Sequence, residues 1–432
     1  MNGGTLARTA TGRLLAGIPW LSLLVMIVVF YPPVLKPFAW ITGQAPWELG
    51  LLDSVAEGSA TRRLQLGILA VTALGLLAFR RSGRSARSAA NSLGWLVALF
   101  AGLVVASVLW SDARPLSARR VVAMGIIGLA AFAYRTMPRE SFLRLVFFTT
   151  LAGVLFGLAR EIVRGSFRPW DPLYRFAGTL STPNVQGWNC ALVVLSGLAL
   201  VHGLRRWRLG LILLVPLASL YLTRSRTSIA ALIGALLLYV FLHLLRGRRL
   251  MLVASLFVAA AASVAVLWME QSANVLEESI RLGREDSGLE TFQGRTELWE
   301  EVLIFAHARP WLGYGYDVFW TSERIEDFSR TLGWMNQNGH SNYLDVLLGI
   351  GYPGLALFVW MMGLALWRAS RCAVGSGNSA DLFAAALIGF CVLHSFLETT
   401  LVGPLFLTLV FLVEVVRLGF PTGASGGAVA SD

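Results

Sequence analysis

Long apolar runs separated by short polar segments dominate the amino-acid sequence. The longest runs reach the ~20 residues that a helix needs to cross ~30 Å of hydrocarbon. The predicted membrane-spanning helices cover residues 14–31, 64–79, 92–110, 121–134, 145–160, 186–203, 209–222, 229–245, 250–268, 343–367, 382–397 and 402–417. The pattern therefore predicts an all-α fold, a polytopic transmembrane helical bundle of about 12 spans.

The composition agrees with a membrane location. Of the 432 residues, 56% are hydrophobic and only 14% are charged, whereas a soluble domain is about a quarter charged. We interpret the net charge of +11 as loop charge that sets orientation, and we expect no nucleic-acid partner. The three Cys residues have neither metal-ligand spacing nor the pattern of a disulfide framework.

The distribution of Arg predicts the orientation. The short connections at residues 80–90 and 203–208 are dense in Arg, and the positive-inside rule places such loops in the cytoplasm. We therefore expect a multi-pass protein of the bacterial inner (cytoplasmic) membrane. Its predicted parts are transmembrane helices one to nine within 1–268, a long periplasmic loop at 269–341, transmembrane helices ten to twelve within 342–418, and a disordered cytoplasmic tail at 419–432.

The long loop has the pattern of amphipathic helices. Ser272 and the Ser-x-x-Glu pattern that begins at Ser287 are typical of helix starts. Apolar residues at helical spacing predict a further helix over 295–306, which Pro310 ends. We expect this helical loop to cover a periplasmic active site.

Arg residues also occur in the segments that this topology places outside, where the rule disfavours them. They are Arg114, Arg119, Arg120, Arg160, Arg164, Arg168, Arg175, Arg224, Arg226, Arg281, Arg284 and Arg295. Cations collected on one face favour an anionic partner there.

Four motifs follow one another on the predicted outer face. They are FAGTLSTPN at 176–184, LTRSRTS at 222–228, GRTELW at 294–299 continued by PWLGYG at 310–315, and HSNYL at 340–344 continued by GYPG at 351–354. In this order they resemble the O-antigen ligase/polymerase family over roughly residues 110–365. One departure concerns the Glu that the family usually has before the glycine after the His-Asn segment. Here that stretch reads LLGIG at 347–351, and Asp345 is the nearest acidic replacement.

The resemblance implies a glycosyltransferase of the O-antigen ligase type, with about 12 helices and its active site facing the periplasm. The implied donor is a glycan linked to undecaprenyl diphosphate, the implied acceptor is the lipid A–core oligosaccharide, and membrane lipids surround the protein. The polymerase of the same family and a protein O-oligosaccharyltransferase are alternatives. A lipid-linked sugar transporter is an alternative from another class, but it would place ionisable residues at mid-membrane.

Transfer from a lipid diphosphate needs a base for the acceptor hydroxyl and cations for the leaving group. His340 is the predicted base, because imidazole titrates near neutral pH. Arg226 and Arg295 are the predicted catalytic cations, and their structural alternatives are an interfacial Arg and a salt bridge to Glu290 or Glu297. No periplasmic carboxylates have metal-ligand spacing, so we expect neither a metal nor another cofactor.

Five further residues are predicted to bind substrate. Arg224 lies beside Arg226 in the second motif, and Arg119 and Arg120 can bind either the diphosphate or an acidic acceptor. The family pattern suggests that Asn184 lines the site. Asn342 is predicted to orient His340 or a sugar hydroxyl.

Overall fold

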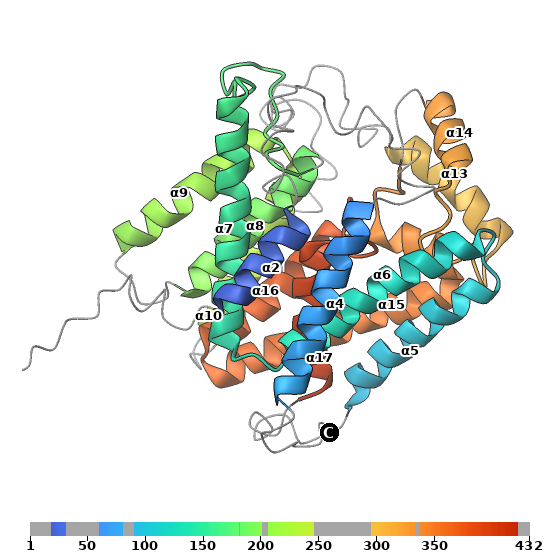
Figure 1. Cartoon of the computed structure of the whole chain (residues 1–432), viewed down its shortest axis with the longest axis horizontal. Coiled ribbons are helices and arrows are strands. Elements are labelled where there is room, and N and C mark those ends of the chain that lie inside the picture. Colours follow the sequence, from blue (N-terminus) through green and yellow to red (C-terminus); the bar gives the residue numbers. More distant parts are fainter. Residues whose placement is uncertain are drawn as a thin grey trace, which may run out of the picture.

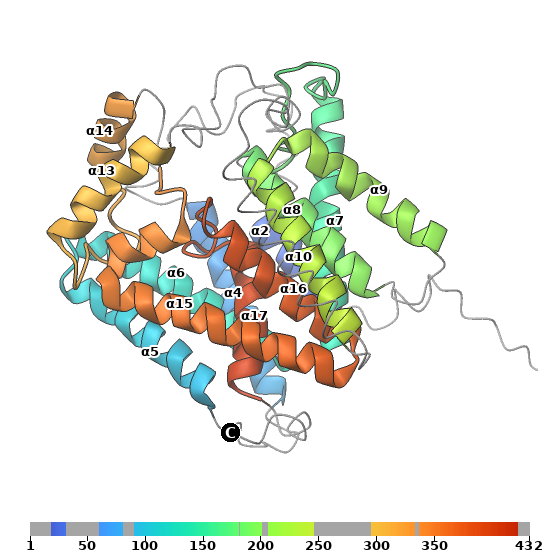
Figure 2. The same cartoon turned by 180° about the vertical axis from the view of Figure 1, so that it is seen from behind.

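The computed structural model describes residues 19–31, 60–80, 90–180, 182–200, 206–245, 295–332 and 337–421. Within these ranges the regular secondary structure is helical (Figures 1 and 2). The helices are α2 (Trp20–Phe30), α4 (Ala60–Arg80), α5 (Ser92–Ala106), η3 (Ser107–Leu109), α6 (Arg114–Tyr134), α7 (Arg139–Val163), α8 (Pro183–Leu200), α9 (Arg206–Thr223), α10 (Arg226–Leu245), α13 (Arg295–Ala308), α14 (Ser322–Leu332), α15 (Asn342–Ser376), α16 (Ser379–His394) and α17 (Phe406–Gly419). The predicted all-α class is confirmed.

Several helices have the length and apolarity of membrane spans. In the described part of the chain, six qualify: Ala60–Ala78, Ser92–Leu109, Arg114–Tyr134, Arg139–Val163, Arg226–Leu245 and Asn342–Ser376. Shorter apolar helices cover Trp20–Phe30, Ile212–Thr223 and Ser379–His394. The predicted span at 250–268 lies outside the described residues. The chain is thus a helical membrane protein, while the count of about 12 spans stays a prediction.

The connections between helices gather at two ends of the bundle. At one end, the Tyr316 hydroxyl donates a hydrogen bond to the carbonyl of Val402 at 2.7 Å. At the other end, Asn91 Nδ2 donates to the carbonyl of Leu418 at 2.7 Å. We call the first the site end, and it includes the connections at 164–180, 224–225, 309–321, 337–341 and 395–405.

Helices α13 and α14 lie together at the site end (Figure 1). The predicted helix over 295–306 is confirmed as α13, which continues to Ala308. Helix α14 was not predicted from the sequence, although Ile325 and Phe328 are buried on one face of it. Both helices pack on an aromatic cluster that includes Phe319. The predicted helix starts at Ser272 and Ser287 lie outside the described residues.

Helix α15 is broken in its first third. Ile350 (φ −134°, ψ 19°) and Gly351 (φ 68°, ψ −173°) leave helical geometry, and Pro353 follows them. A Cβ at Gly351 would lie 2.5 Å from the backbone carbonyl carbon of Trp311. Glycine is therefore required at this position both by its left-handed φ and by the close approach of another backbone segment.

The backbone groups freed by this break are hydrogen bonded to the PWLGYG segment at 310–315. The amide of Tyr314 donates to the carbonyl of Leu348 at 2.8 Å, and the amide of Gly315 donates to the carbonyl of Gly349 at 2.9 Å. Irregular backbone at membrane depth needs such partners inside the protein. The third and fourth sequence motifs thus form one structural unit that fixes the start of α15.

Candidate active site

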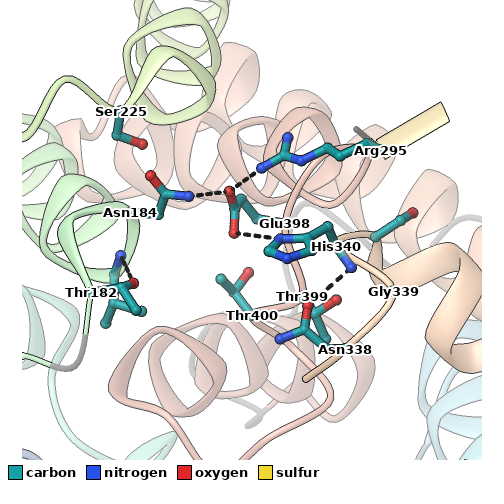
Figure 3. Close-up of polar contacts among 12 residues, drawn as sticks. Thr182, Asn184, Ser225, Arg295, Asn338, Gly339, His340, Glu398, Thr399 and Thr400 are labelled. Atoms are coloured by element: carbon teal, nitrogen blue, oxygen red, sulfur yellow. Dashed lines mark hydrogen bonds and ion pairs between the residues drawn. The ribbon is translucent and has the colours of Figure 1, made fainter. Parts of the chain in front are cut away.

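Three predicted site residues meet at Glu398, which lies in the connection between α16 and α17 (Figure 3). Its Oε1 accepts hydrogen bonds from Asn184 Nδ2 at 2.7 Å and from Arg295 Nη2 at 2.7 Å. Its Oε2 lies 3.9 Å from His340 Nδ1, which is an ion-pair distance rather than a hydrogen bond. The site end of the bundle therefore brings together side chains from α8, α13 and two connections.

The cluster is largely removed from solvent. The side chains of Arg295 and Glu398 are 9% and 10% exposed, and that of His340 is 21% exposed. Burial raises the pKa of Glu398, but contact with His340 and the charges of Arg295 and His394 outweigh it, so that this pKa lies below its ordinary value. Glu398 is thus an ionised carboxylate that compensates Arg295. Of the two partners considered from the sequence, Glu290 lies outside the described residues.

His340 has a left-handed backbone, with φ +48°. Its amide donates to Asn338 Oδ1 at 2.9 Å, which closes a tight turn before α15. A non-glycine residue in this conformation costs about 1–3 kcal/mol and persists only when its surroundings hold it. The turn places the imidazole beside the Glu398 carboxylate (Figure 3).

Asn342 ties the first turn of α15 to the connection that carries Glu398. Its Oδ1 accepts the amides of Thr400 and Leu401 at 3.0 and 2.9 Å, and its Nδ2 donates to Ser395 Oγ at 2.8 Å. Asn342 is fully buried, and these bonds attach it to the connection that carries Glu398. Ser341 stands at the N-cap position of α15, and its hydroxyl donates to the carbonyl of Ser395.

Asn184 bridges Glu398 to a second cation. Its Oδ1 accepts a hydrogen bond from Arg175 Nη2 at 2.9 Å, and Arg175 Nε also donates to the carbonyl of Thr223 at 3.2 Å. Pro183 begins α8, so Asn184 stands in the first helical turn. The first and second sequence motifs therefore meet directly beside Glu398.

A buried carboxylate shapes the first motif. Glu161 Oε1 accepts the amides of Ala177 and Gly178 at 3.1 and 2.7 Å, and its Oε2 accepts the hydroxyl of Tyr174. The amide of Phe176 donates to the carbonyl of Leu222, in the last turn of α9, at 2.9 Å. These contacts fix the loop from which Arg175 reaches Asn184.

The second motif places its two Arg residues differently. Arg224 has φ +51°, and its guanidinium donates to the backbone carbonyls of Asp171 and Pro172. Arg226 is the first residue of α10, and Ser225 precedes it as a buried residue whose hydroxyl bonds that of Ser228 at 3.0 Å. Arg224 thus supports the 171–172 turn, whereas Arg226 stands at the N-terminus of α10. Ser225, which precedes it, is drawn near Asn184 (Figure 3).

Arg119 and Arg120 lie in the first turns of α6. Arg120 Nη1 is 3.3 Å from Asp317 Oδ1. Asp317 has a left-handed backbone, with φ +56°. Burial raises the pKa of the Asp317 carboxyl to about 6, while the charge of Arg120 lowers it and that of Asp345 raises it. Asp317 follows the PWLGYG segment in the sequence. The Arg120–Asp317 pair is separate from the contacts of Glu398.

Glu398 and Arg175 were not predicted from the sequence as site residues. The sequence offers one signal for Glu398, because this carboxylate stands between the last two predicted spans, 382–397 and 402–417. Asp345 was considered as the replacement for the family's acid, but Glu398 is the carboxylate at ion-pair distance from His340. In the described ranges, no three His, Cys, Asp or Glu side chains form a group that could hold a metal ion; the expected independence from metals stays a prediction.

Apolar helices with a buried His–Glu–Arg cluster at one end define a helical membrane protein with a polar site. Residues 209–359 match the family model described as O-antigen ligase, which confirms the resemblance to that family. The chain is also 25% identical over 291 residues to the exopolysaccharide production protein ExoQ of Rhizobium meliloti (strain 1021). That alignment covers 63% of this chain, and the chain spans about 64% of the length of this curated relative.

Proposed function

We propose that this protein is a membrane glycosyltransferase of the O-antigen ligase type. It moves a glycan from undecaprenyl diphosphate to a hydroxyl group of an acceptor at the site end of the bundle. The observation that carries this proposal is the buried cluster in which Glu398 stands between His340 and Arg295. The family match adds support, because residues 209–359 include Arg226, Arg295 and His340.

His340 acts as the general base in this proposal. The acceptor oxygen forms a bond to the anomeric carbon of the donor, the bond from that carbon to the diphosphate oxygen breaks, and the acceptor proton moves to the imidazole. The imidazolium that forms is stabilised by Glu398, whose pKa lies below its ordinary value. This is the division of work found where a carboxylate orients and neutralises a catalytic His.

Arg226 and Arg295 stabilise the leaving diphosphate. A guanidinium is always charged and presents five N–H donors, of which Arg295 uses one Nη2 donor on Glu398. Arg226 begins α10, where the helix N-terminus adds its own positive end to an anion site. Fixed cations of this kind supply the charge stabilisation that a divalent metal supplies elsewhere, so we propose a metal-independent reaction.

Asn184 and Arg175 complete the donor side of the site in this account. Asn184 holds Glu398 in place and is itself held by Arg175. Arg224 supports the loop beside them, and Asn342 positions the Glu398 connection from below. Arg119 and Arg120 stand with Asp317, and we assign them to the acceptor side.

The site end faces the periplasm of the bacterial inner membrane in this proposal. The opposite end carries the basic residues of the helix ends, which are Arg135, Arg139, Arg144, Arg368 and Arg371. Short basic connections favour the cytoplasm. The lipid diphosphate donor then reaches Arg226 and Arg295 from the outer leaflet.

Lipid A–core oligosaccharide is the acceptor that we propose first. A second candidate is a second lipid-linked glycan, which makes the reaction a polymerisation. The similarity to a protein named for exopolysaccharide production favours this second candidate. Glycolipid profiles of a deletion strain separate the two reactions. Free core with accumulated lipid-linked polymer indicates ligation, a core that carries one repeat or a loss of long exopolysaccharide indicates polymerisation, and unchanged profiles of both polymers contradict the proposed function.

A further inference from the structure

Asp345 is a buried carboxylate to which the proposed reaction assigns no chemical step. It lies in the first helical turn of α15 and is 6% exposed. Its Oδ1 accepts hydrogen bonds from Trp320 Nε1 at 2.8 Å and from the amide of Gly339 at 3.0 Å, and its Oδ2 accepts the hydroxyl of Thr399. One side chain thus joins the connections at 309–321, 337–341 and 395–405.

Two of these contacts fall beside the members of the catalytic pair. Gly339 directly precedes His340, and Thr399 directly follows Glu398. Both sequence neighbours are bonded to the same carboxylate, so its position limits how far the imidazole and the Glu398 carboxylate move apart. We propose that Asp345 is a positioning residue that sets the separation of His340 and Glu398.

Hydrogen bonds fix the position of Gly339, the residue through which Asp345 holds the His340 turn. Its carbonyl accepts Trp299 Nε1 from α13 at 2.9 Å, so its peptide groups are held from two sides. A Cβ on Gly339 would lie 3.0 Å from Asp345 Oδ1, which is tighter than ordinary contact. The glycine therefore permits the close approach of the carboxylate to the turn that carries His340.

Asp345 and Asn342 share the work on the Glu398 connection. Asn342 lies one helical turn earlier on the same face of α15 and bonds Ser395, Thr400 and Leu401. These bonds of Asn342 all go to the Glu398 connection, and none of them goes to the turn that contains His340. Asp345 contacts both sides of the catalytic pair, so a carboxylate with about four acceptor sites is suited to this position.

Positioning and proton transfer predict different results for Asp345→Asn. An amide oxygen can still accept Gly339 and Trp320, and the hydroxyl of Thr399 can rotate to accept from the new Nδ2. The asparagine variant therefore keeps the three contacts but cannot accept a proton at neutral pH. Asp345→Ala removes all three contacts and leaves the Gly339 amide and the Trp320 indole without this buried acceptor.

The test uses the purified full-length protein with a lipid-linked donor and measures kcat, KM for the donor and donor binding. We expect Asp345→Ala to lower kcat about 10–100-fold with KM for the donor changed less than about threefold, since a displacement of ~1 Å costs on the order of 10² in rate. We expect Asp345→Asn to stay within about threefold of wild type in kcat, because its contacts survive.

Thr399 gives a second, milder pair of variants. Thr399→Val removes only the bond to the Glu398 side and is expected to lower kcat about tenfold, whereas Thr399→Ser keeps the hydroxyl and restores the rate. If Asp345→Ala does not fold, the kcat values of the two Thr399 variants test the positioning role. Near-normal kcat in Thr399→Val and in a folded Asp345→Ala overturns the inference.

The inference is also overturned if a folded Asp345→Asn protein loses as much kcat as Asp345→Ala, because Asp345 then acts in the chemistry itself. The inference rests on the proposed function, and the wild-type control separates the two. If the wild-type protein transfers no glycan from the lipid-linked donor, the proposed function fails and the inference fails with it. If wild type is active, the variants test the positioning role alone.

Discussion

Arg295 and Glu398 form a buried ion pair across 103 positions of sequence, with Nη2 of the guanidinium 2.7 Å from Oε1 of the carboxylate. The cation that the third motif presents is thus compensated before any substrate arrives. The same carboxylate lies 3.9 Å from His340 Nδ1. Glu398 therefore connects the proposed base, His340, with a proposed leaving-group cation, Arg295.

Glu398→Gln tests this connection. The amide keeps an oxygen for Asn184 and Arg295 but removes the negative charge. We expect transfer to fall about 10²-fold or more, because the imidazolium on His340 loses its counter-charge. Donor affinity should not weaken, since Arg295 becomes an uncompensated cation. Initial rates and equilibrium binding with a lipid-linked donor measure the two effects.

Glu414→Gln is the matched control for that variant. Glu414 forms a buried pair with Arg417 at 2.7 Å at the opposite end of the bundle. Its loss should lower the thermal unfolding temperature and leave the rate of the folded fraction unchanged. A Glu398→Gln protein with the same rate as this control would show that the carboxylate takes no part in transfer.

The break in α15 gives a prediction about stability. Gly351→Ala puts a Cβ 2.5 Å from the carbonyl carbon of Trp311 in a left-handed backbone, and we expect a loss of about 1–3 kcal/mol or more in unfolding free energy. Gly363→Ala, in the same helix with nothing within 4 Å of the added Cβ, should be neutral or stabilising. Thermal unfolding in detergent compares them. Equal unfolding temperatures would mean that the docked PWLGYG segment contributes little to the fold.

Much of the helical architecture follows from the sequence, because apolar length alone specifies a helix that can sit in a bilayer. Helix α13 was predictable as well, since Leu298 and Val302 recur on one face. The pairing of Arg295 with Glu398 was not, because local patterns carry no information about which distant helix ends meet. The left-handed turn at His340 likewise depends on partners from other segments, among them the bond from Gly339 to Asp345.

Metal dependence provides a further prediction. Since Arg226 and Arg295 carry the charge stabilisation in this account, purified protein should retain its full transfer rate in excess chelator. The measurement is the initial rate with and without chelator, at matched ionic strength because exposed charge interactions are screened by salt. Activity that disappears with chelator and returns with Mg²⁺ or Mn²⁺ would assign the leaving-group charge to a metal ion.

The orientation of the site end can be tested by thiol labelling. In a background with Cys372→Ser, a cysteine at exposed Asp327 in α14 should react with an impermeant reagent in intact spheroplasts. A cysteine at exposed Arg371, near the end of α15, should react only after permeabilisation. The positive-inside rule supplies the reason. The reverse pattern would place the site in the cytoplasm and remove the periplasmic donor from the account.

His340→Ala tests the central claim most directly, through the transfer rate and donor binding of the purified variant. We expect transfer to fall by ~10²–10⁴, because the general base is lost, with donor binding close to that of wild type. Arg226→Lys and Arg295→Lys should instead weaken donor binding together with the rate, since the bidentate fork is lost. A His340→Ala protein that transfers at nearly the wild-type rate, or that loses donor binding as severely as the Arg variants, would contradict the assignment of His340 as the base.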